Sequence, residues 1–305
     1  MTTSQPSPFP TGEQYEISSG EHVAVVTEVG ATLRAYSVAG NDVVRGFGVD
    51  EEVHKGRGQQ LLPWPNRIRD GRYTFEGTEQ QLALTEPERR NAIHGLVRHV
   101  AWDLVEKRSR SVRQRVVVRP QPGWPGTLEA TITHTVGDDG LVVDVSAVNL
   151  GTGPVPFGYA AHPYLTVGEK AVDDVDVKLP AAQWLEVDDR LLPVALHPVD
   201  GQHDLREITR LGSRTFDTAF TDLKRNEDGR WRVCLRQGDR RATLWADRSY
   251  PWLQVFTGDD LRDLSIAVEP MTCGPDAFNS GVTHDSMLVL PPGGRFAGTW
   301  GISGR

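Results

Sequence analysis

The sequence predicts an all-β protein built as one large antiparallel domain. Its apolar residues recur mostly with a period of two, which is the period of a strand that faces a core on one side. Its 31 glycines and 20 prolines fall between these short alternating runs. Many short strands separated by turn residues are typical of a β-sandwich or a barrel.

The clearest strands are residues 128–136 and 141–148, which alternate cleanly and are joined by a hairpin-type turn at residues 137–140. Further alternating runs predict strands at residues 22–29, 32–38, 113–119, 231–236, 242–246, 252–257, 264–269 and 286–290. Residues 53–60 could form a short helix. No Gly/Ser-rich linker divides the chain, so we expect a loose N-terminal tail at residues 1–12 and a single domain at residues 13–305.

Composition argues against several functional classes. The net charge of −8 is unfavourable for a nucleic-acid partner, which would need a basic stripe. The two cysteines, Cys234 and Cys273, have no CxxC spacing, and the histidines show no tight metal-ligand spacing. The polar N-terminus resembles no signal peptide, and no apolar stretch approaches the length of a membrane span. We therefore expect a protein of the reducing cytoplasm, with no membrane partner and no metal.

One carboxylate stands out in the alternating run at residues 264–269. Leu264, Ile266 and Val268 point to one face of this run, whereas Glu269 points to the other, beside small residues. A Pro/Gly loop follows, where side chains are commonly presented to ligands. Glu269 is therefore either the floor of a polar cleft or an ordinary solvent-facing strand residue, and its own strand does not decide between the two.

A histidine with restricted backbone freedom lies upstream. Pro163 holds His162 in an extended conformation, and Tyr159 and Tyr164 flank it. His162 could be a general acid beside an aromatic wall, or a structural histidine packed against two rings.

Four further polar segments could bind a ligand. Asn66 and Arg67 follow a rigid stretch that contains Trp64, whose ring could stack on a sugar, and the planar fork of an arginine suits paired oxygens. His94 precedes Gly95, which permits an unusual backbone angle or the close approach of a ligand. The remaining candidates are an aspartate between two aromatic residues and a glutamine on the non-leucine face of its strand: Asp217 and Gln254.

Taken in this order, these segments resemble the aldose 1-epimerase, or mutarotase, family from about residue 15 to about residue 300. The motifs that carry the resemblance are Asn66-Arg67-Ile68, Asn91-Ala-Ile-His94-Gly95, His162-Pro163-Tyr164, Phe216-Asp217, Gln254, and Glu269-Pro270 with Asn279. The resemblance implies a galactose mutarotase-like β-supersandwich with a sugar-binding cleft across one concave sheet face. It also implies a monosaccharide partner, and a protein that is a monomer or a homodimer.

The resemblance assigns a role to each matched residue. Glu269 takes the place of the general base and His162 that of the general acid. The residues that would hold the sugar are His94, Arg67, Asp217 and Gln254, with Asn66 and Tyr164 in the same motifs. Opening a hemiacetal ring needs one base and one acid, so no cofactor or metal is expected. We expect a Glu269 carboxylate and a His162 imidazolium on opposite sides of the C1–O5 unit of the sugar.

The sequence departs from many family members at Trp64-Pro65, where they carry small residues. With Trp64-Pro65 at this position, the sequence resembles a bacterial subgroup associated with sulfosugar metabolism. The identity of the sugar therefore stays open, and the protein could be an epimerase for a hexose 6-sulfonate or 6-phosphate. Such an anionic sugar would need a basic lining, for which the candidates are Arg67, Arg69, Arg98, Arg240 and Arg241. The residues are also compatible with a glycoside hydrolase that uses two carboxylates, and with a non-catalytic carbohydrate-binding protein of the same fold.

Overall fold

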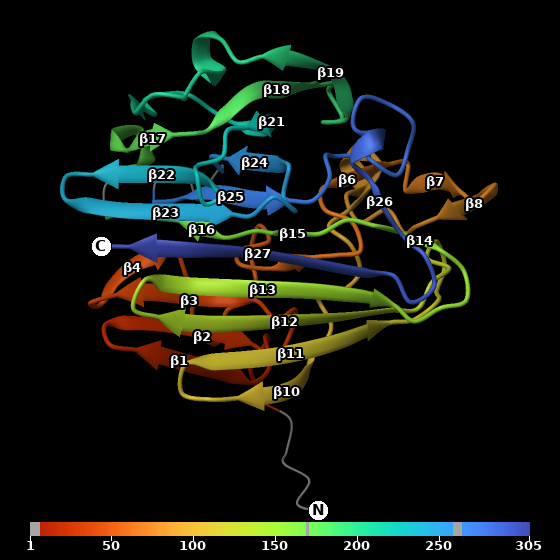
Figure 1. Cartoon of the computed structure of the whole chain (residues 1–305), viewed down its shortest axis with the longest axis horizontal. Coiled ribbons are helices and arrows are strands. Elements are labelled where there is room, and N and C mark those ends of the chain that lie inside the picture. The colour runs from red at the N-terminus through yellow and green to blue at the C-terminus, as the bar shows by residue number, and fades with distance from the viewer. Residues whose placement is uncertain (1–6, 169–170, 259–263) are drawn as a thin grey trace, which may run out of the picture.

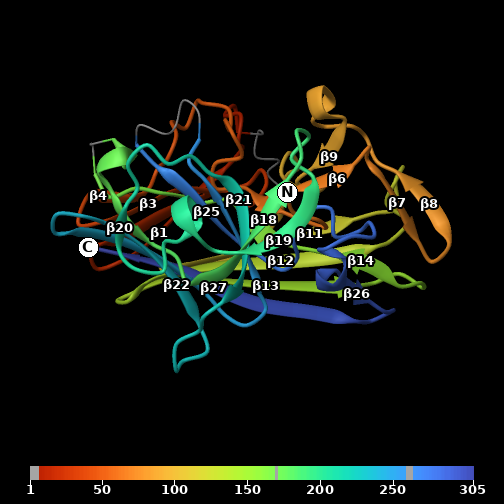
Figure 2. The ribbon, with the colours of Figure 1, turned by 90° about the horizontal axis from the view of Figure 1, so that it is seen from above.

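Two large antiparallel sheets stack face to face in the computed structural model, which describes residues 7–168, 171–258 and 264–305. Figure 1 shows one sheet in front, from β10 to β22, and Figure 2 shows the two layers lying one over the other. In the described ranges the regular structure is almost entirely strand, which confirms the predicted all-β class. The stack follows from the alternating sequence, because each sheet has one apolar face to cover.

The larger sheet has twelve strands. Its main path, in spatial order, is β1 (Gln14–Ser19), β2 (His22–Thr27), β3 (Leu33–Val38), β4 (Asn41–Val44), β16 (Tyr164–Leu165), β25 (Ile266–Met271), β24 (Trp252–Phe256), β21 (Asp217–Leu223), β18 (Ala181–Val187) and β19 (Pro193–Pro198). Two short strands branch from β25: β15 (Ala160–Ala161) and, beyond it, β5 (Gln60–Leu61).

The second sheet has nine strands. In spatial order they are β10 (Asp103–Lys107), β11 (Ser111–Val118), β12 (Leu128–Gly137), β13 (Gly140–Asn149), β27 (Arg295–Gly304), β23 (Arg240–Ala246), β22 (Trp231–Gln237), β17 (Asp176–Lys178) and β20 (Thr209–Arg210). The predicted hairpin is confirmed, since β12 and β13 pair along their whole length up to Gly137 and Gly140.

Smaller elements complete the fold at one end and at the loops. Three two-stranded ladders join β6 (Arg67–Arg69) to β9 (Asn91–Ile93), β7 (Arg72–Phe75) to β8 (Thr78–Gln81), and β14 (Val155–Phe157) to β26 (Leu288–Leu290). The strands β6 to β9 gather at one end of the molecule (Figures 1 and 2). The helical turns in the described ranges are all 3-10: Pro87–Arg89, Val172–Asp174, Gly201–His203 and His284–Ser286.

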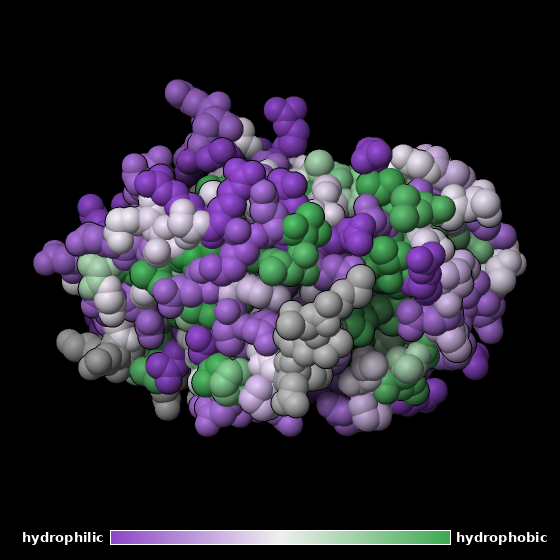
Figure 3. Space-filling model, turned by 90° about the horizontal axis from the view of Figure 1, so that it is seen from below, coloured by the Kyte–Doolittle hydropathy of each residue, from purple (hydrophilic) through white to green (hydrophobic). Residues whose placement is uncertain are grey.

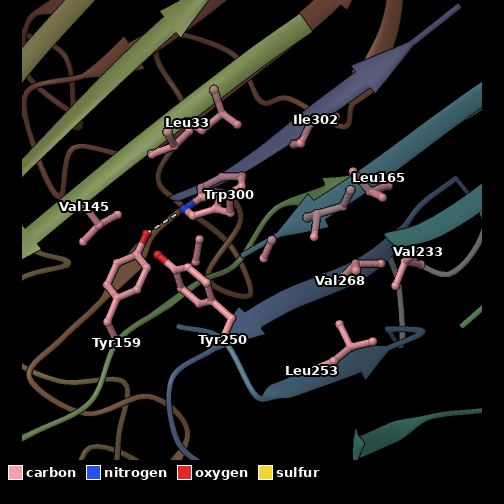
Figure 4. Close-up of a cluster of buried hydrophobic side chains, with 14 of the residues drawn as sticks. Leu33, Val145, Tyr159, Leu165, Val233, Tyr250, Leu253, Val268, Trp300 and Ile302 are labelled. Carbon is pink, nitrogen blue, oxygen red and sulfur yellow. Dashed lines mark hydrogen bonds between the residues drawn. The ribbon is translucent and has the colours of Figure 1, made fainter. Parts of the chain in front are cut away.

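The core fills the space between the two sheets. Figure 4 shows Leu253 and Val268 of the larger sheet in one buried cluster with Val145 and Ile302 of the smaller sheet. The indole of Trp300 donates a hydrogen bond to the hydroxyl of Tyr159 across 3.1 Å, so these aromatic side chains are buried without losing a polar partner. Burial of this apolar surface is the main force that holds the sheets together.

The surface contrasts with this core. Most of the face in Figure 3 is hydrophilic, and its hydrophobic residues lie in separate patches. No helix in the described ranges is long and apolar enough to cross a membrane.

The expected helix at residues 53–60 is wrong. Residues 55–58 form a turn, in which Gly56 and Gly58 have φ angles of 72° and 70°. A Cβ at Gly58 would lie 2.0 Å from the carbonyl oxygen of Leu33, so only glycine lets the turn approach β3 this closely.

The expected strand boundaries differ from the observed ones by up to two residues, and the tail also differs from expectation. The strand expected at 286–290 begins at Leu288, since the 3-10 turn ends at Ser286, and the strand expected at 264–269 runs instead from Ile266 to Met271. Residues 1–6 of the expected tail lie outside the described residues. Thr11 is buried and its carbonyl accepts a hydrogen bond from Val29, so a loose tail does not extend to residue 12.

One buried histidine is costly for the fold at acid pH. His134 lies on the inner face of β12, fully buried, and neither ring nitrogen has a hydrogen-bond partner among the described residues. Burial lowers the pKa of His134 to about 3. Because the unfolded chain takes up this proton near pH 6.5 and the folded chain does not, stability is full above that pH and falls below it.

We expect His134→Leu to flatten this acid dependence. From pH 7.5 to 5.5 the natural protein should lose about 1.4 kcal/mol of unfolding free energy through this one group, and the variant should not. Urea unfolding at the two pH values measures the difference. An equal loss in both proteins would contradict the assignment.

Candidate active site

A polar cleft lies on the side of the larger sheet that faces away from the core. Its volume is about 790 Å³, within the ~300–1,000 Å³ common for small-molecule sites. Its walls come from distant parts of the chain, including residues 53–59, 66–67, 85–99, 215–217 and 254–258. His162 and Glu269 also line it.

Strand β25 supplies the carboxylate at the floor of this cleft. Ile266 and Val268 belong to the core, and Glu269, on the opposite face, is only 2% exposed. Glu269 is therefore not an ordinary solvent-facing residue, and the interpretation as a cleft carboxylate is the one that the structure supports. The strand is buried along both faces, so Glu269 reaches the cleft from a buried position.

His162 lies between β15 and β16 and contacts Glu269. The distance from its Nε2 to Oε1 of Glu269 is 3.3 Å. The segment that replaces the expected helix fixes the backbone of His162. The N–H of His162 donates to the carbonyl of Gln59, and the carbonyl of His162 accepts from the N–H of Gly58. A Cβ at Gly56 would lie 3.2 Å from the imidazole, so this glycine lets the turn pack against the ring.

The aromatic residues near His162 differ from expectation. Tyr164 stacks on the imidazole with ring centroids 5.2 Å apart, but it is fully buried and does not line the cleft. Its hydroxyl donates to the carbonyl of Lys55, so it supports His162 from behind. Tyr159 points into the core, and Trp64 is buried against Phe278, so neither forms an aromatic wall for a sugar.

His94 enters the cleft with a defined tautomer. It follows β9 and has a φ of 64°, and the backbone N–H of Asn66 lies 3.2 Å from its Nδ1. Because an amide N–H can only donate, Nδ1 is the acceptor and the neutral ring carries its proton on Nε2. Burial lowers the pKa of His94 well below its usual value, which keeps the ring neutral. Gly95, at φ 71°, allows a close approach to the carbonyl of Leu62, as expected of this glycine.

A network of charges and amides forms another part of the cleft lining. Arg67 pairs through two nitrogens with Glu86 at 2.9 and 3.0 Å, and its Nη2 lies 3.6 Å from Asp217. Gln254 donates to Asp217 across 2.6 Å. Asp217, Gln254 and Glu269 come from the neighbouring strands β21, β24 and β25, so sheet pairing alone brings them together.

Burial changes the protonation expected for the central pair. It raises the pKa of Glu269 well above its usual value and lowers that of His162 to about 4. The expected imidazolium is therefore not the resting form, because desolvation outweighs the attraction of the carboxylate. The two side chains are also in contact, so they do not lie far apart on opposite sides of a ligand.

Four buried polar atoms in this cleft have no hydrogen-bond partner within the described part of the chain. They are Oε1 of Gln59, Nδ1 of His162, Oε1 of Gln254 and Oε2 of Glu269. An unsatisfied buried polar atom costs ~1–3 kcal/mol, so their concentration in one cleft indicates a polar ligand. A larger hollow of about 1440 Å³, lined by residues such as Lys178 and Arg232, contains none of these unpaired buried atoms.

Seven of the eight site residues expected from the sequence line the cleft, and its polar lining also contains residues that were not expected. Asn66, Arg67, His94, His162, Asp217, Gln254 and Glu269 all line the cleft. Glu86 and Gln59 were not expected there, since no motif marks them; the only available signal is that a buried Arg67 requires a carboxylate. Within the described ranges, no group of three or more His, Cys, Asp or Glu side chains could hold a metal ion.

Comparison with known proteins identifies the family of this chain. The model of the aldose 1-epimerase family matches residues 13–303. The chain is 31% identical to the uncharacterized protein YihR of Escherichia coli K12, an alignment that covers 93% of this chain and 90% of that protein. It is 28% identical to the galactose mutarotase of Sus scrofa, with 94% and 92% covered.

Solved structures confirm the fold. A galactose mutarotase-like protein from Clostridium acetobutylicum superposes with a TM-score of 0.85 at 17% identity, covering 95% of this chain and 94% of that one. An aldose epimerase homologue from C. elegans gives the same TM-score at 20% identity, covering 96% and 98%. With the family match over almost its whole length, the chain belongs to the aldose 1-epimerase family and is an isomerase that acts on carbohydrates.

Proposed function

We propose that this protein interconverts the α and β anomers of an aldohexose, with Glu269 and His162 moving the protons. The observation that carries this proposal is the 3.3 Å contact between a buried carboxylate and a buried imidazole in a cleft that contains unpaired polar atoms. Acid and base groups with shifted pKa values in a concave site are typical of proton-transfer enzymes.

The chemistry needs two proton transfers. In ring opening, the base takes the proton of the O1 hydroxyl, the C1–O5 bond breaks with its electrons on O5, and the acid protonates O5. The C1 aldehyde then rotates by about half a turn, and the reverse steps close the ring on its other face. O1 and O5 are both bonded to C1, so two side chains in contact can face both oxygens at once.

One proton suffices for the pair. A neutral imidazole beside a carboxyl group and an imidazolium beside a carboxylate contain the same number of protons, and they differ by a transfer across the 3.3 Å contact. A hydroxyl that donates to Glu269, and the positive charge of Arg67, would favour the carboxylate once sugar is bound. We assign Glu269 as the base and His162 as the acid of the opening step.

The remaining residues would hold the sugar. Asp217 is partly open to the cleft and can accept from sugar hydroxyls while Arg67 and Gln254 fix its position. The Nε2–H of His94 is a neutral donor that could stabilise negative charge on O5. Asn66 supports His94, and Tyr164 acts as a positioning residue behind His162.

We expect Glu269→Gln and His162→Asn each to lose roughly 10²–10⁴-fold in the catalysed rate of anomer exchange, because each removes one proton-transfer group. Polarimetry of freshly dissolved α-D-glucose and α-D-galactose measures the rate, and calorimetric titration measures sugar binding, which should persist.

A matched pair outside the cleft provides the control. Glu186 and His197 are 2.7 Å apart and partly exposed. Glu186→Gln and His197→Asn should leave the rate of anomer exchange unchanged. Full activity in either cleft variant would remove that residue from the mechanism.

The shifted pKa values predict the pH dependence of kcat/KM. When the Glu269–His162 pair takes up a second proton, neither side chain can act as the base. Because burial places the pKa of His162 at about 4, the acid limb of the kcat/KM profile should lie well below pH 6.5. When the pair loses its single proton, neither side chain can act as the acid. The raised pKa of Glu269 therefore places the alkaline limb of the profile above the ordinary carboxyl range. Initial rates from pH 3.5 to 9 test both limbs, after subtraction of the uncatalysed exchange. An acid limb centred near pH 6.5 would contradict this assignment.

A further inference from the structure

One cleft arginine has no role in the network described above. Arg98 lines the cleft beside the histidines, and its positive charge contributes to the lowered pKa of His94, His99 and His162. It therefore lies on the His162 side of the cleft.

Arg98 differs from the other arginines of the lining in its contacts. Arg67 and Arg89 both pair with Glu86. In the described part of the chain, no hydrogen bond or ion pair involves the guanidinium of Arg98, although burial is sufficient to lower its pKa. A partly buried charge without a partner is costly, and a bound anion would offset that cost.

The other basic candidates lie elsewhere. Arg69 pairs with Asp276, Arg240 donates to the carbonyl of Asp42, and Arg241 contacts the sulfur of Cys234. None of the three lines the cleft. Arg98 is therefore the cleft arginine whose donors are available to a ligand.

We propose that Arg98 binds an anionic group on C6 of the sugar, so that the preferred substrate is an aldohexose with a sulfonate, carboxylate or phosphate at that position. This inference rests on the proposed function, in which His162 faces the ring oxygen. C6 is attached to C5, the neighbour of that oxygen, so its substituent falls beside His162. The planar fork of a guanidinium matches two oxygens of any of these anions.

Asp217 gives the sugar its direction in the cleft. Its carboxylate, held by Arg67 and Gln254, suits neutral hydroxyls and repels an anion. The neutral side of the sugar would therefore face Asp217 and the charged side Arg98.

The test is a ratio of specificity constants. NMR exchange spectroscopy gives kcat/KM for anomer exchange of glucose, glucuronate, glucose 6-phosphate and 6-deoxy-6-sulfoglucose. With the natural protein, at least one anionic sugar should exceed glucose by about 10-fold or more. In Arg98→Met the ratio of that anionic sugar to glucose should fall about 10- to 100-fold, which is typical for loss of a charged hydrogen bond.

Two further variants sharpen this comparison. Arg98→Lys keeps the charge and should restore part of the ratio. Arg110→Met is the matched control, because Arg110 is exposed and does not line the cleft, and it should leave the ratio as in the natural protein. A ratio within one variant is independent of the fraction of correctly folded protein.

A binding measurement separates failure of this inference from failure of the proposed function. If no sugar shows anomer exchange, the proposed function is rejected, and calorimetric dissociation constants for the same sugars then test Arg98. Tighter binding of an anionic sugar that is lost in Arg98→Met supports the inference. Equal binding of anionic and neutral sugars, no binding of any anionic sugar, or an unchanged ratio in Arg98→Met overturns it.

Discussion

Strand β25 is buried on both faces, and the site depends on this constraint. Ile266 and Val268 pack in the core between the sheets, while Glu269 faces the cleft from the same strand. A carboxylate in this position cannot be solvated by bulk water, so its charge is controlled by the groups packed around it. The contact with His162 and the attraction of Arg67 follow from that restriction, and so does the sensitivity of the site to a single proton.

Much of the fold could be predicted because it is encoded locally. The alternation at residues 128–136 and 141–148 predicts two strands and their turn without knowledge of the rest of the chain. The site was predictable through a different route, the order of short motifs around His162 and Glu269. Motif order identifies residues that meet in a cleft, but it gives neither their distances nor their charges.

The features that could not be predicted are those set by distant contacts. The turn at residues 55–58 exists because Gly58 fits against the carbonyl of Leu33, which local helix propensity does not report. Glu86 partners Arg67 across a loop with no characteristic spacing. The neutral form of His162 reflects burial, and burial is a property of the folded molecule rather than of the motif.

Strand β27 has a consequence for how the chain reaches its native state. It lies between β13 and β23 in the middle of the nine-stranded sheet, and so joins a group of strands from residues 103–149 to another from residues 176–246. The two groups of strands cannot join into one sheet until residues 295–304 have inserted between them. Such long-range closure is entropically slow and leaves two unpaired strand edges open during folding. Folding intermediates of this protein should therefore be the species most at risk of edge-to-edge aggregation, while the completed sheet buries both edges within itself.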